Sequence, residues 1–347
     1  MSKNLSSLTA PASSIRVTSK GWVLSASVLL LCFMATLSLL VGTRPIAPAS
    51  VLNALIAYDP NLPDHIIIHD YRLPRTLLGL LCGAAFAMSG ALIQAATRNP
   101  LADPGLLGVN AGAAFFVTVA IGMFGFHSLN AYVLAALAGA ISATLFVYIL
   151  GGTGREGATP VRLVLAGVAL SAVLAGITSS ITLLNPRAFD TMRFWAIGSL
   201  AGRDMNVVTT VAPFMVIGMV LGLVASRPLN AVALGNELAQ SLGADIHRAR
   251  VLVVLSVTLL AGAATAAVGP ISFVGLMVPH VVRWFTGPDQ RWIIGMTIIF
   301  GPTLLLAADI LGRLVVFPGE LEAGIVTAFI GAPILILFAR RPKASGL

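Results

Sequence analysis

Charged residues are scarce in this chain of 347 residues. Asp, Glu, Lys and Arg together make up 10% of it, whereas hydrophobic residues make up 57%. A soluble domain carries roughly 25% charged residues, because its water-facing surface has to be covered with polar groups. The composition therefore excludes a water-soluble enzyme, a nucleic-acid-binding domain and a disordered scaffold. It predicts a protein whose solvent is mostly lipid.

Motifs that carry covalent chemistry are also missing. The sequence has no GxxxxGK[ST] loop with which to hydrolyse ATP, and no HExxH, CxxC or GxSxG pattern. Its two cysteines, Cys32 and Cys82, lie within apolar runs, which favours small buried side chains over a disulfide or a metal site. No two of the five histidines have ligand spacing on one apolar helix. We therefore predict a protein that is not an enzyme and that holds no metal ion or cofactor.

Long hydrophobic runs, in contrast, fill most of the chain. A helix needs about 20 apolar residues to cross a bilayer. Hydropathy and helix-breaking residues divide the chain into ten such segments, at 22–41, 74–97, 106–126, 130–150, 161–184, 206–225, 251–268, 272–286, 292–314 and 323–338. Small residues at GxxxG spacing, such as Gly79 with Gly83 and Gly218 with Gly222, indicate closely packed helices. The predicted fold is an all-α polytopic membrane protein with about ten transmembrane helices.

The positions of the basic residues predict the orientation of the chain. If both ends lie in the cytoplasm, about two thirds of the 21 Lys and Arg residues fall in cytoplasmic loops and tails, as the positive-inside rule requires. Residues 1–20 and 341–347 are then cytoplasmic tails, and residues 21–340 form the transmembrane domain. The cytoplasmic loop with the most polar residues is 227–250.

A weak internal repeat relates the two halves of the chain. The stretch GAAFAMSG at 83–90 recurs as GAATAAVG at 262–269, in the second and seventh predicted helices. With five helices in each half, these two helices would cross the membrane in opposite directions. Halves related in this way are typical of inverted-repeat transporters.

Arginines gather at the predicted outer ends of two helices. Arg72 and Arg75 bracket Pro74, a residue type that readily begins a helix. Such arginines could anchor the helix at lipid headgroups, or they could bind acidic residues of an external partner, since a guanidinium group matches the shape of a carboxylate. Asp309 and Arg313 lie four residues apart near the outer end of the ninth helix, so we expect them to form an ion pair along it.

Two inner segments differ from the rest in composition. Residues 97–108 contain two prolines and two glycines, which excludes a continuous helix there. Residues 233–243 predict one short amphipathic helix, because Leu234, Leu238 and Leu242 recur every fourth residue and Gly243 can end the helix. Such a helix could lie on the membrane or fit a groove on a cytoplasmic partner.

Polar groups within the predicted helices are few. Ser171, Thr178 and Thr182 fall on one face of the fifth helix. Because polar groups inside a bilayer are expensive, those that occur there are candidates for function. We expect this face to line a path and not to contact lipid.

Several stretches together resemble the permease subunits of type II ABC importers, the family that carries ferric siderophores, haem and cobalamin. They are RLPRT at 72–76, GAAFAMSGALIQAATRNPLADPGLLGVNAGA at 83–113, VRLVLAGVAL at 161–170, ALG…LG at 233–243, GPISFVGLMVPHVVRW at 269–284 and ADILGR…PGEL…GAP at 308–333. They cover nearly the whole chain in the family's order. The stretch LLNPRAFDTMRFWAIGSL at 183–200 most resembles permeases for catecholate siderophores of the ferric-enterobactin type.

The resemblance implies a bundle with inverted-repeat halves and a set of partners. Two permease subunits would enclose the path in a bacterial inner membrane, with the fifth helix lining it. The second subunit would be a related chain in preference to a second copy of this one. Two cytoplasmic ATPase subunits would bind the segment 233–248 as a pair of coupling helices. A periplasmic siderophore-binding protein would dock on the periplasmic arginines. The residues that match the family's docking positions are Arg72, Arg75 and Arg313, and those that match its coupling segment are Leu234, Gly235, Glu237, Leu238, Leu242 and Gly243.

Other functions remain open at this point. A haem or cobalamin permease shares the same motifs, and no short motif identifies the ligand. An ion-coupled secondary transporter would bury more carboxylates near the middle of the membrane than this sequence offers. A membrane-embedded enzyme would need a cluster of His, Asp or Glu that the sequence lacks.

Overall fold

The chain folds into a bundle of helices, shown by a computed structural model that describes residues 20–126, 128–152, 159–241 and 243–339. All regular structure within these residues is helical. The helices that match the ten predicted segments are α1 (Lys20–Leu40), α4 (Leu73–Thr97), α5 (Val109–Gly122), α6 (Leu129–Gly152), α7 (Pro160–Leu184), α9 (Met205–Ala233), α11 (Ile246–Val268), α12 (Val274–Thr286), α13 (Gln290–Val315) and α14 (Ala323–Ala339). Every predicted segment therefore corresponds to a helix, which confirms the all-α fold.

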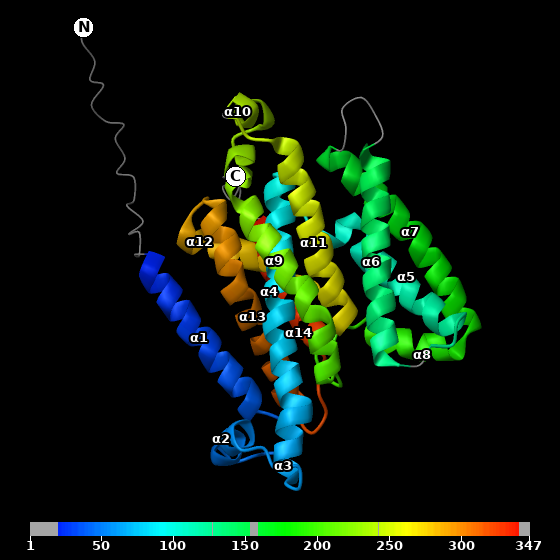
Figure 1. The fold of residues 1–347 in the computed structure, drawn as a ribbon, viewed down its shortest axis with the longest axis vertical. Coiled ribbons are helices and arrows are strands. Elements are labelled where there is room, and N and C mark those ends of the chain that lie inside the picture. Colours follow the sequence, from blue (N-terminus) through cyan, green and yellow to red (C-terminus); the bar gives the residue numbers. More distant parts are fainter. Residues whose placement is uncertain (1–19, 127, 153–158, 242, 340–347) are drawn as a thin grey trace.

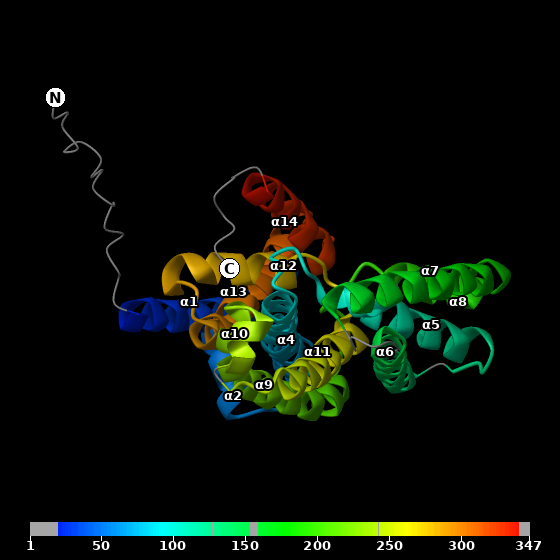
Figure 2. The same cartoon turned by 90° about the horizontal axis from the view of Figure 1, so that it is seen from above.

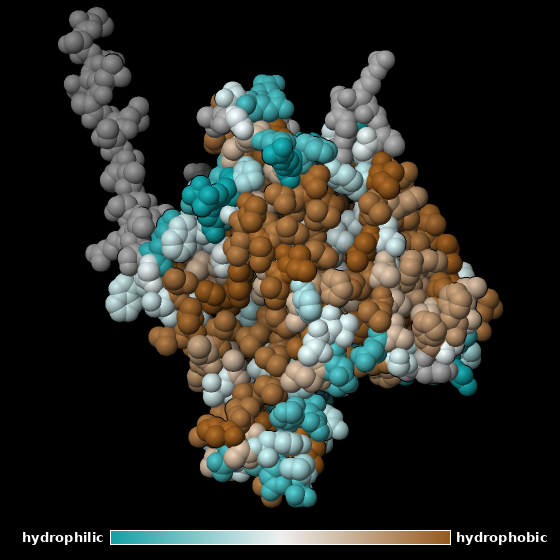
Figure 3. Space-filling view, viewed as in Figure 1, coloured by the Kyte–Doolittle hydropathy of each residue, from teal (hydrophilic) through white to brown (hydrophobic). Residues whose placement is uncertain are grey.

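Seven of the described stretches are long and apolar enough to cross a membrane, and α5 and α14 are shorter apolar helices. The surface agrees with this, because an apolar belt separates polar residues near α10 (Asn236–Ser241) from polar residues near α2 (Pro48–Ile56) and α3 (Pro63–Ile66) (Figure 3). We refer to these two polar regions as the α10 end and the α2/α3 end of the bundle. The predicted tails lie outside the described residues except for Lys20, so their location stays a prediction.

Several short helices were not predicted from the sequence. They are α2 (Pro48–Ile56), α3 (Pro63–Ile66), a π-helical turn (Ile67–Arg72), α8 (Pro186–Trp195) and a 3-10 turn (Pro104–Leu107), whereas α10 (Asn236–Ser241) lies inside the short helix predicted over 233–243. Because α3 and the π-helical turn run directly into α4, Pro74 does not begin a helix after a loop. Instead the chain is helical from Pro63 to Thr97. The predicted break at 97–108 is confirmed, since Arg98 and Gly108 adopt left-handed backbone angles there.

Helix α4 lies at the centre of the larger group of helices and packs against α9, α11, α12 and α13 (Figures 1 and 2). Small residues allow this approach. A Cβ atom on Gly90 would lie 1.9 Å from the carbonyl oxygen of Gly275 in α12, and one on Gly83 would lie 2.6 Å from Pro302 in α13. The dense small residues of the sequence therefore serve packing within one chain.

A second group, formed by α5, α6, α7 and α8, stands beside the first. Its helix α7 is the most exposed of the group, with only 11% of its most apolar stretch buried. Seen along the bundle, α7 and α14 lie toward one long side of the molecule, and α9 and α11 lie toward the other (Figure 2). Helices α4 and α11, which carry the repeated sequence, run in opposite directions between the two ends, as predicted.

Candidate functional site

The first candidate residue, Arg72, lies at the end of the π-helical turn and points back at the end of α1. Its guanidinium group donates hydrogen bonds to the carbonyl oxygens of Leu39 and Leu40, both at 2.8 Å, and to that of Arg44 at 2.5 Å. The last carbonyl groups of a helix have no partner within the helix. Arg72 supplies that partner. Its side chain is covered by the end of α1, and only 6% of the residue is exposed.

Arg313, in the last turns of α13, contacts the same end of α1. It donates to the carbonyl oxygens of Ser38 and Val41, at 2.8 and 2.7 Å, and to the Ser38 hydroxyl at 3.0 Å. It also forms the predicted ion pair with Asp309, four residues earlier in the same helix. Only 3% of Arg313 is exposed. Arg72 and Arg313, which are distant in sequence, thus both donate hydrogen bonds to the carbonyl groups at the end of α1.

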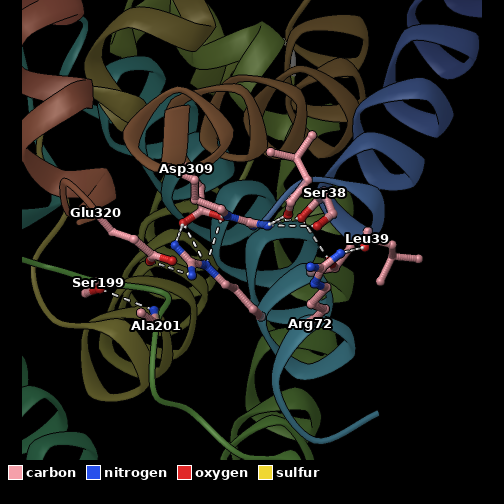
Figure 4. Close-up of polar contacts among 11 residues, drawn as sticks. Ser38, Leu39, Arg72, Ser199, Ala201, Asp309 and Glu320 are labelled. Carbon is pink, nitrogen blue, oxygen red and sulfur yellow. Dashed lines mark hydrogen bonds and ion pairs between the residues drawn. The ribbon is translucent and has the colours of Figure 1, made fainter. Parts of the chain in front are cut away.

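Arg75, one turn after Arg72, binds two carboxylates. Its Nε and Nη2 atoms donate to Asp309, with distances of 3.1, 3.1 and 2.8 Å, and its Nη1 donates to Glu320 at 2.8 Å (Figure 4). Asp309 is only 1% exposed and accepts from both Arg75 and Arg313. The carboxylate of Asp309 therefore joins α4 to α13 at the α2/α3 end.

These arginines line a cavity of ≈ 310 Å³ that reaches the surface at the exposed residues Arg44 and Tyr71. Its lining is formed by Gly42, Thr43, Arg44, Ile67, Tyr71, Arg72, Arg75, Ala201, Gly202, Arg313 and Glu320. Arg72 and Arg313 are buried and Arg75 is partly buried, and together these three guanidinium groups face two carboxylates, Asp309 and Glu320, while Arg44 pairs with Asp64. One positive charge is therefore left over among the three. Since arginine matches carboxylates in shape and charge, this cavity is suited to an acidic side chain of a partner.

The structure brings together the three arginines that the sequence singled out, and it adds Arg44 and Glu320, which sequence reasoning missed. Glu320 lies within the PGEL motif at 318–321, so the family motif marked its neighbourhood without indicating a role. The headgroup-anchoring alternative does not fit Arg72 and Arg313, because both guanidinium groups are buried within the chain.

The coupling segment at the opposite end differs from the prediction of one helix over 233–243. Helix α9 ends at Ala233, Gly235 adopts a φ of 110°, and α10 spans only Asn236–Ser241. A residue with a positive φ interrupts a right-handed helix, and glycine permits it at little cost. Leu234 and Leu238 therefore lie on different elements, although both are exposed, at 61% and 51%.

The other predicted coupling residues can be placed in part. Glu237 is exposed on α10, and Gly243 ends the segment with a φ of 80°, as predicted. Leu242 lies outside the described residues. A pair of hydrogen bonds anchors the segment: Asn230, near the end of α9, donates to Asp289 at 2.8 Å and accepts from the Gln290 N–H at 2.8 Å. The bond from Asn230 lowers the pKa of the Asp289 carboxyl below its usual value.

The hydroxyl face of α7 is less open than the sequence suggested. Ser171, Thr178 and Thr182 are all half-buried, and the Thr178 hydroxyl is covered by the chain without a hydrogen-bond partner. Thr182 donates within its own helix, to the carbonyl oxygens of Thr178 and Ser179. The exposed side of α7 instead carries Gly176 and Ser180. That these three residues line a path stays a prediction.

Cysteine labelling of α7 tests this lining. The Thr178 hydroxyl is covered in the present arrangement. If its face of α7 lines the path, we expect Thr178→Cys to react with a water-soluble thiol reagent in at least one nucleotide state of the assembled transporter. Ser180→Cys, on the exposed side, serves as the comparison in a background without Cys32 and Cys82. A Thr178→Cys variant that stays inert in every nucleotide state, while Ser180→Cys reacts, would place the path on the Ser180 side.

Comparisons with known proteins bear on the whole chain. Residues 29–341 match the model of the FecCD transport family. The chain belongs to this family. It is 48% identical over 318 residues to the ferric enterobactin transport system permease protein FepD of Escherichia coli (strain K12), a match that covers 92% of this chain and 95% of that protein. It is 35% identical over 323 residues to the Fe(3+) dicitrate transport system permease protein FecC of the same organism, covering 92% of this chain and 96% of the other.

A solved structure supports the FecCD assignment. The chain matches a metal-chelate type ABC transporter in an inward-facing conformation with a TM-score of 0.80 and 27% sequence identity, covering 93% of this chain and 100% of that one. The predicted type II ABC permease fold is confirmed, and so is the resemblance to this family. The FecCD chain is a multi-pass membrane protein and a permease subunit of an ABC importer, which excludes the ion-coupled secondary transporter. Within the described residues no three His, Cys, Asp or Glu side chains gather as a metal site would require.

Proposed function

We propose that this permease carries a ferric siderophore of the catecholate type across a bacterial inner membrane. The observation that carries the proposal is the 48% identity to the ferric enterobactin permease along 92% of the chain. The stretch at 183–200, which includes α8, supports the finer assignment to catecholates. The chain has no P-loop, so the ATP that drives transport is hydrolysed on two separate ATPase subunits.

The two ends of the bundle take different partners in this proposal. The α10 end faces the cytoplasm, where the exposed leucines Leu234 and Leu238 meet the ATPase subunits. The α2/α3 end faces the periplasm, where the arginine-lined cavity receives acidic side chains of the siderophore-binding protein. The positive-inside bias of the sequence supports this orientation, with both termini in the cytoplasm.

A second, related permease packs against the side of the molecule that carries α7 and α14. Support comes from α7, whose apolar surface is left mostly bare by its own chain, and from the position of both helices on one long side (Figure 2). Packing there would place Ser171, Thr178 and Thr182 near the boundary between the two permeases, where the path lies.

Uptake by a deletion strain tests the function directly. We expect a strain that lacks this permease to lose uptake of a labelled ferric catecholate siderophore, and the restored gene to recover it. Haem and cobalamin uptake, measured in parallel, should be unchanged in the deletion strain. Loss of haem or cobalamin uptake, with ferric catecholate uptake intact, would instead support the alternative permease function, which shares the family motifs.

A further inference from the structure

Glu320 is the most exposed member of the cluster formed by Arg72, Arg75, Asp309, Arg313 and Glu320. It lies in the non-helical segment between α13 and α14, and its side chain is 29% exposed, compared with 1% for Asp309. Within the described residues it pairs with Nη1 of Arg75, at 2.8 Å, while Asp309 accepts from Nε and Nη2 of the same guanidinium group (Figure 4). Arg75 is therefore bound on a buried side by Asp309 and on an outer side by Glu320.

The outer side of Arg75 faces the cavity that we assign to the binding protein. Among the residues that line this cavity, Glu320 is the one acidic side chain, and four are arginines. An incoming carboxylate would find the donors of Arg72 and Arg313 turned toward the end of α1. Arg44, at the mouth of the cavity, is 59% exposed and pairs with Asp64, which is 36% exposed. Deeper in the cavity, Nη1 of Arg75 is the donor whose described partner lies close to the surface, since Glu320 is 29% exposed.

We propose that the Glu320 carboxylate holds the position on Arg75 that a carboxylate of the periplasmic binding protein takes when it docks. Docking then exchanges one carboxylate for another on Nη1, and Asp309 keeps its bonds to the same guanidinium group throughout. Glu320 thus competes with the binding protein and sets how tightly it docks. This inference rests on the proposed docking function of the cavity.

The local structure allows the exchange without unfolding. The backbone next to Glu320 is fixed, because the Leu321 N–H donates to the Gly312 carbonyl at 3.0 Å and the Glu322 carbonyl accepts from Ile325 at 3.0 Å. The side chain of Glu320 can therefore leave Arg75 by rotation about its own bonds, while the segment stays in place. A partly exposed ion pair of this kind contributes modestly to stability, so its loss does not threaten the fold.

Two substitutions separate exchange from a general charge effect. Glu320→Ala frees Arg75 and removes a negative charge, whereas Glu320→Asp frees Arg75 but keeps the charge, since its carboxylate is one carbon shorter. Glu322→Gln, two residues away, is the matched control for charge alone. The measurement is the Kd of the binding protein that co-purifies with the wild-type transporter, determined on the full permease–ATPase complex in nanodiscs.

Exchange predicts that Glu320→Ala and Glu320→Asp both lower the Kd by about fivefold, which corresponds to the upper range of an exposed ion pair, and that Glu322→Gln leaves it unchanged. Equal tightening by Glu320→Ala and Glu322→Gln, with Glu320→Asp like wild type, would reduce the effect to long-range charge and overturn the proposal. Weaker docking in both Glu320 variants would show that Glu320 positions Arg75, which also overturns it. A wild-type complex that binds no periplasmic protein would instead contradict the proposed docking function itself.

Discussion

Replacing Asp309 with alanine is expected to lower the free energy of unfolding by about 3–5 kcal/mol, because the change leaves buried guanidinium charges without their carboxylate. Arg313 is 3% exposed and would keep only its neutral partners at the end of α1, while Arg75 would keep only Glu320. The measurement is the thermal unfolding midpoint of the purified permease in detergent, together with the fraction that stays monodisperse after heating.

A matched control is Asp190→Ala on α8. Asp190 also faces an arginine on its own helix, Arg193, but the pair is 4.0 Å apart and its side chains are 69% and 56% exposed. We expect this variant to stay within about 0.5 kcal/mol of wild type. If Asp309→Ala unfolds at the wild-type temperature, the cluster does not hold α4 and α13 together in the way that the geometry indicates.

The second large effect is expected at the opposite end, where Leu238→Asp should abolish transport. The substitution leaves the fold intact, because Leu238 is 51% exposed on α10. At an interface with an ATPase subunit, however, it would place a carboxylate where an apolar side chain is buried. The loss of one central apolar contact is worth about 2 kcal/mol or more, which is roughly a thirtyfold loss of affinity.

Transport, ATP hydrolysis stimulated by the loaded binding protein, and pull-down of the ATPase measure this effect. Leu62→Asp is the control, since Leu62 is similarly exposed, at 45%, but directly precedes α3 at the α2/α3 end. We expect Leu62→Asp to retain ATPase binding. Normal assembly and transport in Leu238→Asp would show that α10 is not a coupling surface.

The sequence predicts the bundle well because its main signal is strong and local. Runs of about 20 apolar residues require little information beyond hydropathy, so all ten predicted segments correspond to helices. The ends of the helices were predicted less well. Helix α9 continues to Ala233 and α11 begins at Ile246, because polar residues such as Asn230 and Arg248 extend helices beyond the apolar region.

The site could be predicted only where its contacts are local. The pair Asp309–Arg313 follows from helical spacing, whereas the contact of Asp309 with Arg75 joins residues 234 positions apart and has no periodic signal. In the coupling segment, local spacing predicted one continuous helix that the structure does not contain. The spacing of Leu234, Leu238 and Leu242 suggested one helix, but Gly235 turns the chain between the first two.

The end of α1 has a consequence for the order in which this protein can mature. Its carbonyl groups at Ser38 and Val41 are satisfied by Arg313, which lies 275 positions after Ser38 in the chain. During synthesis, α1 reaches the membrane long before α13 is made, so this end must first rely on water or headgroups for its hydrogen bonds. Arg72 can donate to the carbonyl groups of Leu39 and Leu40 early in synthesis. Arg313 can donate to those of Ser38 and Val41 only after nearly the whole chain has been translated. A chain that ends before α13 would therefore lack the donor for the carbonyl groups at the end of α1. A C-terminal truncation would then expose unpaired groups near the N-terminus, where a quality-control protease could recognise them.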